Sequence, residues 1–293
     1  MFKGKILLFL AFNSIILSFL QGEDSKNEIK PPKIGNFSLP SSQQPGSLYG
    51  FGQGVIDKGE VQLFFYADDF VGRHKTNVDY FPSVVFGVTE ELSLGFYFPF
   101  TTYFKYNQFQ SDGLEDCYIE AEYSIYYKTT YDYEEGTSVV AELFFPTGSN
   151  LKNPSTGFGA PAFFLGPSYY RTWIDWFVFN GVAAMIIGSD HGSKFGDQFV
   201  YQLGFGRNFP SPTGWIYAWL VEVDGLYSKK NRTMGVIDDN SGGNTIYVTP
   251  SLFLSTWDMV FQFGISFPVN QHLFGNQRKI DYGLNFNFSK SFY

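Results

Sequence analysis

The chain has 293 residues, of which 20% are aromatic and only 16% are charged, and its formal net charge at pH 7 is -8. Ordinary soluble domains carry about 25% charged residues, so the composition argues against a soluble globular protein. The acidic balance argues against nucleic acid as a partner, and the single cysteine, Cys117, excludes an intrachain disulfide framework.

The N-terminus has the features of a secretory signal. Lys3 and Lys5 precede an apolar stretch over Ile6–Leu20, which matches the charged and hydrophobic parts of an export signal. The stretch is shorter than the roughly 20 apolar residues of a membrane-spanning helix, although a permanent N-terminal anchor is the alternative. We assign the signal peptide to residues 1–22 and expect cleavage near Gly22.

Residues 23–58 differ in composition from the remainder of the chain. They are rich in Pro, Ser, Lys and Gln, a composition typical of chain that builds no packed core of its own. We expect a periplasmic N-terminal extension, partly disordered, that leads into the first strand.

Residues 59–293 carry a period-two alternation of apolar and polar residues, which indicates half-buried β-strands. Clear examples are Leu92–Phe98, Phe199–Gly206, Phe261–Phe267 and Ile280–Phe288. One face of each consists of Leu, Phe, Tyr or Ile, and the other of Gly, Ser, Gln, Asn or Asp. No helical periodicity of comparable length competes with this pattern.

About twelve such segments follow one another, an even number of the kind that single-chain outer-membrane barrels have. Their expected starts are Gly59, Asp79, Leu92, Asp116, Thr137, Ala162, Trp173, Asp197, Trp215, Thr245, Met259 and Lys279. The spacing leaves no room for helical crossovers, so the strands must be antiparallel, and in lipid the sheet must close. We therefore predict an all-β transmembrane barrel in the cell outer membrane, with both termini periplasmic.

The connections support this topology, because periplasmic turns should be short and extracellular loops longer. The expected turns are Thr89–Glu91, Thr129–Gly136, Arg171–Thr172, Asn208–Gly214 and Ser255–Asp258, of which Thr129–Gly136 is longer than usual. The expected long loops are Thr101–Glu115, Thr147–Pro161 and Ser228–Asn244.

All five tryptophans fall in or near the expected periplasmic turns. They are Trp173, Trp176, Trp215, Trp219 and Trp257. Indole rings prefer the headgroup region of a bilayer, where an apolar body meets water. We expect these residues to anchor the barrel at the membrane interface.

The last strand resembles the C-terminal signal that the outer-membrane insertion machinery reads. Ile280, Tyr282, Leu284, Phe286 and Phe288 form its alternating apolar face. Five residues follow Phe288, so either the signal is internal, or Phe292 and Tyr293 serve in a shifted register. The insertion machinery is thus an expected partner.

Several short motifs stand in an order that resembles one family. They are Lys58-Gly59, Pro82 with Gly87–Glu90, Pro99, Gly113–Asp116, Phe145–Ser149, and Gly264-Ile265 with Pro268. The chain from Gly50 to Phe288 resembles the outer-membrane transporters associated with the meta-cleavage pathway of phenol degradation. The resemblance implies a barrel that takes up small organic compounds, with aromatic ones among the candidates.

Several carboxylates fall on the polar faces of the expected strands. They are Glu120, Glu122, Glu142, Glu222 and Asp224. A carboxylate that faces lipid is costly, so these side chains are expected to line the lumen. They would form either an acidic constriction that favours cations or neutral polar solutes, or a hydrated lumen without flow.

Outer-membrane lipid and lipopolysaccharide are the other expected partners. The cations of the expected loops could meet lipopolysaccharide phosphates or could simply be solvated, and they are Arg73, Lys75, Lys229, Lys230, Arg232, Arg278 and Lys279. Asp238, Asp239 and Asn240 are a weak calcium candidate, and we expect no metal and no cofactor.

We expect no catalytic residues. The histidines, His74, His191 and His272, all fall in expected loops. The residues Ser189–Ser193 contain the letters of a catalytic triad, but neighbours in one short loop seldom converge as a triad. The sequence thus favours a channel or transporter. The alternatives are a structural or surface-interaction barrel and, less favoured, an outer-membrane hydrolase.

Overall fold

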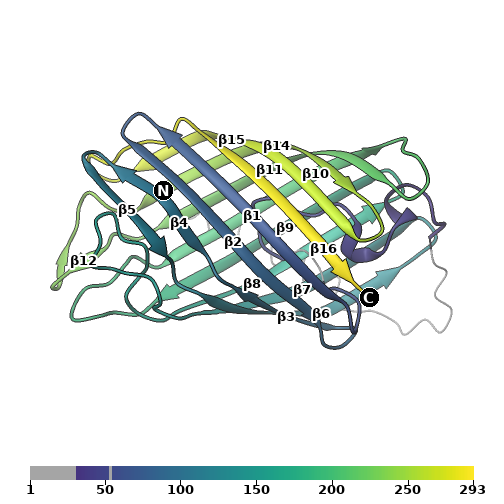
Figure 1. The fold of residues 1–293 in the computed structure, drawn as a ribbon, viewed down its shortest axis with the longest axis horizontal. Helices are drawn as coiled ribbons and strands as arrows, with labels where there is room; N and C mark the ends of the chain where they lie inside the picture. Colours follow the sequence, from purple (N-terminus) through teal and green to yellow (C-terminus); the bar gives the residue numbers. More distant parts are fainter. Residues whose placement is uncertain (1–30, 53–54) are drawn as a thin grey trace, which may run out of the picture.

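A computed structural model describes residues 31–52 and 55–293, so the expected signal peptide, residues 1–22, lies outside the described part. One antiparallel sheet dominates the fold (Figure 1). Its strands are β1 (Val61–Gly72), β2 (Lys75–Gly87), β3 (Leu92–Tyr97), β4 (Phe100–Tyr106), β5 (Phe109–Leu114), β6 (Tyr118–Thr129), β7 (Tyr133–Phe144), β8 (Ala162–Trp173), β9 (Trp176–Ile187), β10 (Gln198–Phe209), β11 (Ile216–Ser228), β14 (Gly243–Ser255), β15 (Met259–Leu273) and β16 (Tyr282–Phe292).

The sheet closes on itself because β1 pairs with both β2 and β16. β3 and β4 both pair with β2, one after the other along its length, and together they occupy one strand position in the barrel. β6 pairs with β3 and β5 pairs with β4, so β5 and β6 together occupy the next position. Counted in this way, the barrel has 12 antiparallel strands, and the predicted fold is confirmed. Closure pairs both edges of the wall strands except at β5, which pairs with β4 alone.

The strand positions agree closely with the alternation in the sequence. β3, β8 and β15 begin at the expected residues, Leu92, Ala162 and Met259. The largest difference is the expected loop Thr101–Glu115, most of which forms the β4–β5 hairpin. This hairpin carries Thr102, Gln110 and Asp112 at exposed positions where a strand in lipid would carry apolar residues, and the alternation therefore did not reveal it.

The two ends of the barrel differ. Short connections, residues 88–91, 130–132, 174–175, 210–215 and 256–258, lie at the end where the chain terminates, which we name the turn end. The opposite end, which we name the loop end, carries the longer connections, residues 145–161, 188–197, 229–242 and 274–281. Residues 229–242 include a small hairpin of β12 (Arg232–Thr233) and β13 (Val236–Ile237). The expected turn Thr129–Gly136 shrinks to residues 130–132, because β6 and β7 extend further than the alternation indicated.

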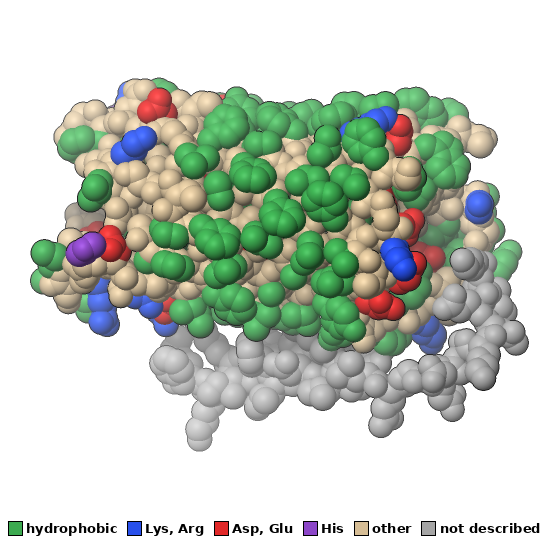
Figure 2. All heavy atoms as spheres, turned by 60° about the horizontal axis from the view of Figure 1, so that its bottom comes forward, with side chains coloured by type: hydrophobic (Ala, Val, Ile, Leu, Met, Phe, Trp, Pro, Cys, Tyr) green, Lys and Arg blue, Asp and Glu red, His purple; other side chains and the backbone are tan. Residues whose placement is uncertain are grey.

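The wall has an apolar outer face and a polar inner face. Large hydrophobic side chains such as Leu203, Phe205 and Leu252 are exposed, and Figure 2 shows them as a broad band with charged side chains gathered toward the two ends. On β16 the inward residues Asn285, Ser289 and Ser291 are buried. This is the arrangement that a lipid-facing barrel requires. None of the described helices is long and apolar enough to span a membrane.

The described part of the N-terminal segment lies inside the barrel, whereas we expected residues 23–58 to form a periplasmic extension, partly disordered. We name residues 31–52 and 55–60 the plug segment. It enters at the turn end (Figure 1) and includes the 3-10 helices η1 (Gly35–Ser38) and η2 (Ser41–Gln43). Its Leu39 packs in a buried cluster with inward residues of β9, β11, β14 and β15, so the barrel supplies the core that this polar segment lacks.

Candidate functional site

The plug segment is anchored first at the turn end. Asn36, which is fully buried, donates from Nδ2 to the carbonyl oxygens of Trp173 (2.9 Å) and Trp176 (3.2 Å). Its Oδ1 accepts a hydrogen bond from Asn208 Nδ2 (3.2 Å). One side chain thus ties the plug segment to three strands, β8, β9 and β10.

A second anchor joins the plug segment to the strands near the C-terminus. Gln43 Nε2 donates to Ser291 Oγ (2.8 Å), and Ser255 Oγ donates to the carbonyl of Gln43 (2.7 Å). All three residues are buried. These small inward hydroxyls explain why the polar faces of β14 and β16 are rich in serine.

The third anchor is a carboxylate midway along β11. Glu222, with no exposed surface, accepts hydrogen bonds from the backbone N–H groups of Leu48 (2.8 Å) and Tyr49 (3.2 Å). Bonds between N–H groups and an ionised carboxylate are stronger than those between neutral groups. Glu222 therefore binds the plug segment and is not a free lumen carboxylate.

The adjacent strand β10 continues the contact. Phe51 donates its N–H to Gln202 Oε1 (2.8 Å), and Gln202 Nε2 donates to the Phe51 carbonyl (2.6 Å). The ring of Phe51 meets that of Phe164 at 5.0 Å between centroids. The amide side chain of Gln202 thus makes the two hydrogen bonds to the backbone of Phe51 that a neighbouring β-strand would make.

The plug segment then returns to the turn end. Ile56 donates its N–H to Ser93 Oγ (3.0 Å), and Gly59 donates to the carbonyl of Gly87 (2.8 Å). The chain continues directly into β1. The described parts of the plug segment thus form hydrogen bonds with strands β8 to β11, β14, β16, β3 and β2.

The predicted lumen carboxylates separate into two groups. Glu120 and Glu142 are direct cross-strand neighbours on β6 and β7, and Glu122 lies beside them and accepts a hydrogen bond from Ser138. Tyr97 O–H donates to Glu120 Oε1 (3.1 Å). Glu222 and Asp224 lie on β11, in contact with or next to the plug segment.

A further acidic group is absent from the residues that the sequence predicts for the lumen. Asp68 and Asp79 are cross-strand neighbours on β1 and β2, and Thr101 Oγ1 lies 2.5 Å from both Asp79 Oδ1 and Glu115 Oε1. The sequence pattern puts Glu115 in a loop and Asp79 at the first position of a strand. The alternation of Asn77, Asp79 and Phe81 is the signal that could have revealed this group.

Four of the inward carboxylates, Glu120, Glu142, Asp79 and Glu115, take no part in the ion pairs of the described residues. The ion pairs within residues 31–52 and 55–293 involve Glu135, Asp175, Asp190, Asp197, Asp239 and Asp258. None of these is Glu120, Glu142, Asp79 or Glu115.

The five tryptophans lie at the turn end. Trp173 ends β8, Trp176 begins β9, Trp219 is on β11, and Trp215 and Trp257 are in turns. Arg171 lies over the ring of Trp173 (4.9 Å) and Arg207 over that of Trp176 (5.2 Å). The position suits the expected interface role, which remains a prediction.

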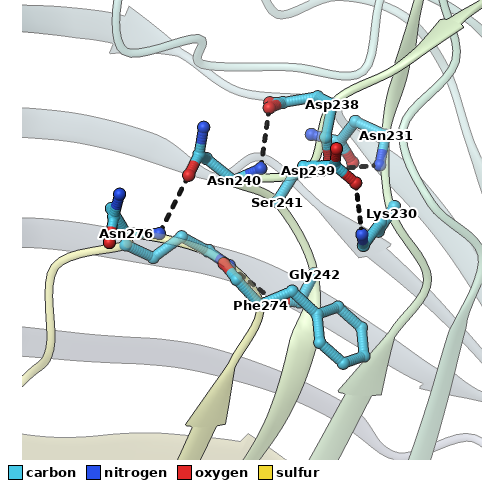
Figure 3. Close-up of polar contacts among 10 residues, drawn as sticks. Lys230, Asn231, Asp238, Asp239, Asn240, Ser241, Gly242, Phe274 and Asn276 are labelled. Atoms are coloured by element: carbon cyan, nitrogen blue, oxygen red, sulfur yellow. Dashed lines mark hydrogen bonds and ion pairs between the residues drawn. The ribbon is translucent and has the colours of Figure 1, made fainter.

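The loop end is held together by its own polar contacts (Figure 3). Lys230 pairs with Asp239 (2.5 Å), Asp238 Oδ1 accepts the N–H of Asn240, and Asn240 Oδ1 accepts the N–H of Asn276. These oxygens already have donors. Within the described residues, no group of three or more His, Cys, Asp and Glu side chains could hold a metal ion.

Comparison with protein-family models finds no match, and comparison with curated proteins finds none either. Among solved structures, the chain is similar to the COG4313 outer membrane channel from Pseudomonas putida F1, with a TM-score of 0.66 and 16% identity over 85% of this chain and 99% of that one. It is more distantly similar to the NanC porin, with a TM-score of 0.44 and 11% identity over 78% and 98%. These identities speak for the fold alone. The chain therefore has the fold of outer-membrane β-barrel proteins, a closed antiparallel barrel of 12 strands.

Proposed function

We propose that the protein is an outer-membrane channel for small cationic or neutral polar solutes, narrowed by its own N-terminal segment. The observation that carries the proposal is the pair of inward carboxylates Glu120 and Glu142, direct cross-strand neighbours that form no ion pair within the described residues. In a narrow tube with low-dielectric walls, fixed negative charge attracts cations and repels anions. The similarity in fold to an outer membrane channel supports the same function.

The plug segment restricts the width of this pathway. Its hydrogen bonds to Gln202 and Glu222 hold it against the neighbouring strands β10 and β11 on the inner side of the wall. Solutes would pass between the plug segment and the acidic wall of β1, β2, β6 and β7. The small organic compounds implied by the family resemblance remain candidates for such a pathway.

Planar-bilayer recordings in a KCl gradient test the proposal. We expect small channels whose reversal potential has the sign of cation preference. The double variant Glu120→Gln/Glu142→Gln should weaken that preference. The control double variant Glu90→Gln/Asp132→Asn removes two carboxyl groups that are exposed in turns, and it should leave the preference unchanged. Anion preference, or a folded barrel that never conducts, would contradict the proposal.

A further inference from the structure

A cavity of about 220 Å³ lies between the barrel wall and the loops of the loop end. Strands β2, β4 and β6 and the end of β7 form its walls, and residues 155–158 and Phe195 cover it. Much of its lining is aromatic, from Phe81, Phe104, Tyr118, Phe144, Phe158 and Phe195. The volume suits a small ligand such as one ring with a short arm.

The aromatic rings form a continuous row. Tyr97 stacks on Tyr118 (4.4 Å between centroids), and Tyr118 stacks on Phe144 (4.6 Å). Phe144 meets Phe158 at 6.4 Å, and Phe158 meets Phe195 at 5.6 Å. The faces of such rings are electronegative, so they attract cations as well as other rings.

The polar groups at one side of the cavity include more hydrogen-bond acceptors than hydrogens to donate. Thr101 Oγ1 is 2.5 Å from oxygens of both Asp79 and Glu115, but a hydroxyl group has only one hydrogen to donate. One of the two contacts therefore needs a hydrogen from elsewhere. It can come from a proton on a carboxyl group or from a ligand that donates.

Two further oxygens nearby are buried without a hydrogen-bond partner. Asn77 lines the cavity, and its Oδ1 has no donor although its Nδ2 donates to Asp79. Asp68, only 7% exposed and directly across from Asp79, has an unpartnered Oδ1. Lys75, on the same face of β2, forms no ion pair in the described part of the chain. Buried acceptors without donors are costly, so the site is suited to a donor-rich ligand.

We propose that this cavity binds a small organic cation that joins an aromatic ring to a primary ammonium group. The ammonium group would donate to Glu115 and Asn77, and the ring would pack against Tyr118 and Phe158. The proposal rests on the proposed channel function, for which it names a class of solute. An alkali-metal ion would be too small to pack against the aromatic walls on both sides, and a neutral aromatic compound without donors would leave the acceptors unsatisfied.

Isothermal titration calorimetry on the refolded full chain in micelles, with empty micelles as the reference, tests the ligand class. The probe is 2-phenylethylammonium. The comparison compounds are 2-phenylethanol, which keeps the ring without the charge, and ethylammonium, which keeps the charge without the ring. We expect the probe to bind, and both comparison compounds to bind at least about tenfold more weakly. Equal binding of 2-phenylethanol, or no binding of the probe, would overturn the proposal.

Variants locate the site. Glu115→Gln should weaken binding of the probe about tenfold or more, and Phe158→Leu, in a loop outside the wall, should weaken it by a smaller factor. The control Glu90→Gln, in an exposed turn, should bind as the unmodified chain does. Unchanged binding by Phe158→Leu and Glu115→Gln would place the ligand elsewhere. If Glu115→Gln does not fold, Phe158→Leu alone decides.

The titrations test the binding site independently of the proposed function, because they measure ligand binding and do not depend on ion conduction through the barrel. A barrel that binds the probe but never conducts would contradict the channel and leave the site intact. A cation-preferring channel that does not bind the probe would contradict the site alone.

Discussion

The backbone N–H of Leu48 donates a 2.8 Å hydrogen bond to the carboxylate of Glu222, which lies 174 positions further along the chain. Tyr49 donates to the other oxygen of the same carboxylate. A single buried side chain of the wall thus satisfies two consecutive amides of a segment that has no regular secondary structure there. This contact determines how firmly the plug segment is held midway along the lumen.

Glu222→Gln should loosen the plug segment. An amide has one acceptor oxygen where a carboxylate has two, so one of the N–H groups of Leu48 and Tyr49 loses its partner. The local cost is about 1–3 kcal/mol, and hydrogen exchange of these two amides should accelerate about tenfold or more. The control is Glu120→Gln, which changes an inward carboxylate on β6 instead of the one on β11. Unchanged exchange in Glu222→Gln would show that the carboxylate does not hold the segment.

Gly35 and Gly59 form a matched pair within the plug segment. Both have positive φ, +56° and +86°, so alanine costs about 1–2 kcal/mol at either position. Only at Gly35 would the new Cβ also clash, at 2.1 Å from the carbonyl oxygen of Ile174, whereas no atom lies within 4 Å at Gly59. Gly35→Ala should therefore displace the anchor at Asn36 and raise single-channel conductance, and Gly59→Ala should not. Equal conductance in the two variants would argue against a plug that docks on the β8–β9 turn.

Asp197 couples two loops at the loop end in a pH-dependent way. Partial burial alone would raise the pKa of Asp197, but hydrogen bonds from Lys194 and Lys229 outweigh it and lower the pKa to about 2. Because the folded pKa lies below the ordinary value of about 4, this stabilisation is present above pH 4 and is lost as the pH falls toward 2. Pepsin cleavage of residues 229–242, normalised to an unfolded peptide, should be faster at pH 2 than at pH 4. In Asp197→Asn it should already be fast at pH 4, and a wild-type pattern in that variant would refute the coupling.

Glu135 and Arg171 are cross-strand neighbours on the outward face of β7 and β8 near the turn end. Glu135 is 3% exposed, lies 3.7 Å from Arg171 Nε, and accepts a hydrogen bond from Tyr126 and another from Tyr169, each of 2.9 Å. Arg171→Ala would leave this carboxylate without its cation. Because Arg171 is partly exposed, we expect a loss of about 1–3 kcal/mol, between the values for surface and buried pairs.

The double variant Glu135→Gln/Arg171→Met removes both charges and should cost less than Arg171→Ala alone. Urea unfolding of the barrel in lipid vesicles measures both. If the double variant is the less stable one, the pair contributes net stability, and our expectation is wrong.

Period-two alternation is sufficient to predict the barrel from the amino-acid sequence. A strand with one face toward lipid and one toward the lumen must alternate, so the positions of β3, β8 and β15 and the lumen orientation expected for Glu120 and Glu142 could be derived from this pattern alone. The alternation failed where lipid no longer imposes it, as in the β4–β5 hairpin beyond Thr101. Glu115 lies in the connection between β5 and β6, as the pattern indicates, but its place in the wall of the cavity depends on the folded hairpin.

The location of the plug segment and the role of Glu222 depend on the folded barrel. The plug segment has no periodicity, and its composition resembles that of disordered chain. The hydrogen bonds that fix it in place join it to the barrel wall. Asn36, Gln43 and Leu48 find their partners on strands more than a hundred residues away. Contacts of this kind form only when the sheet has closed, so no local pattern in the sequence could predict them.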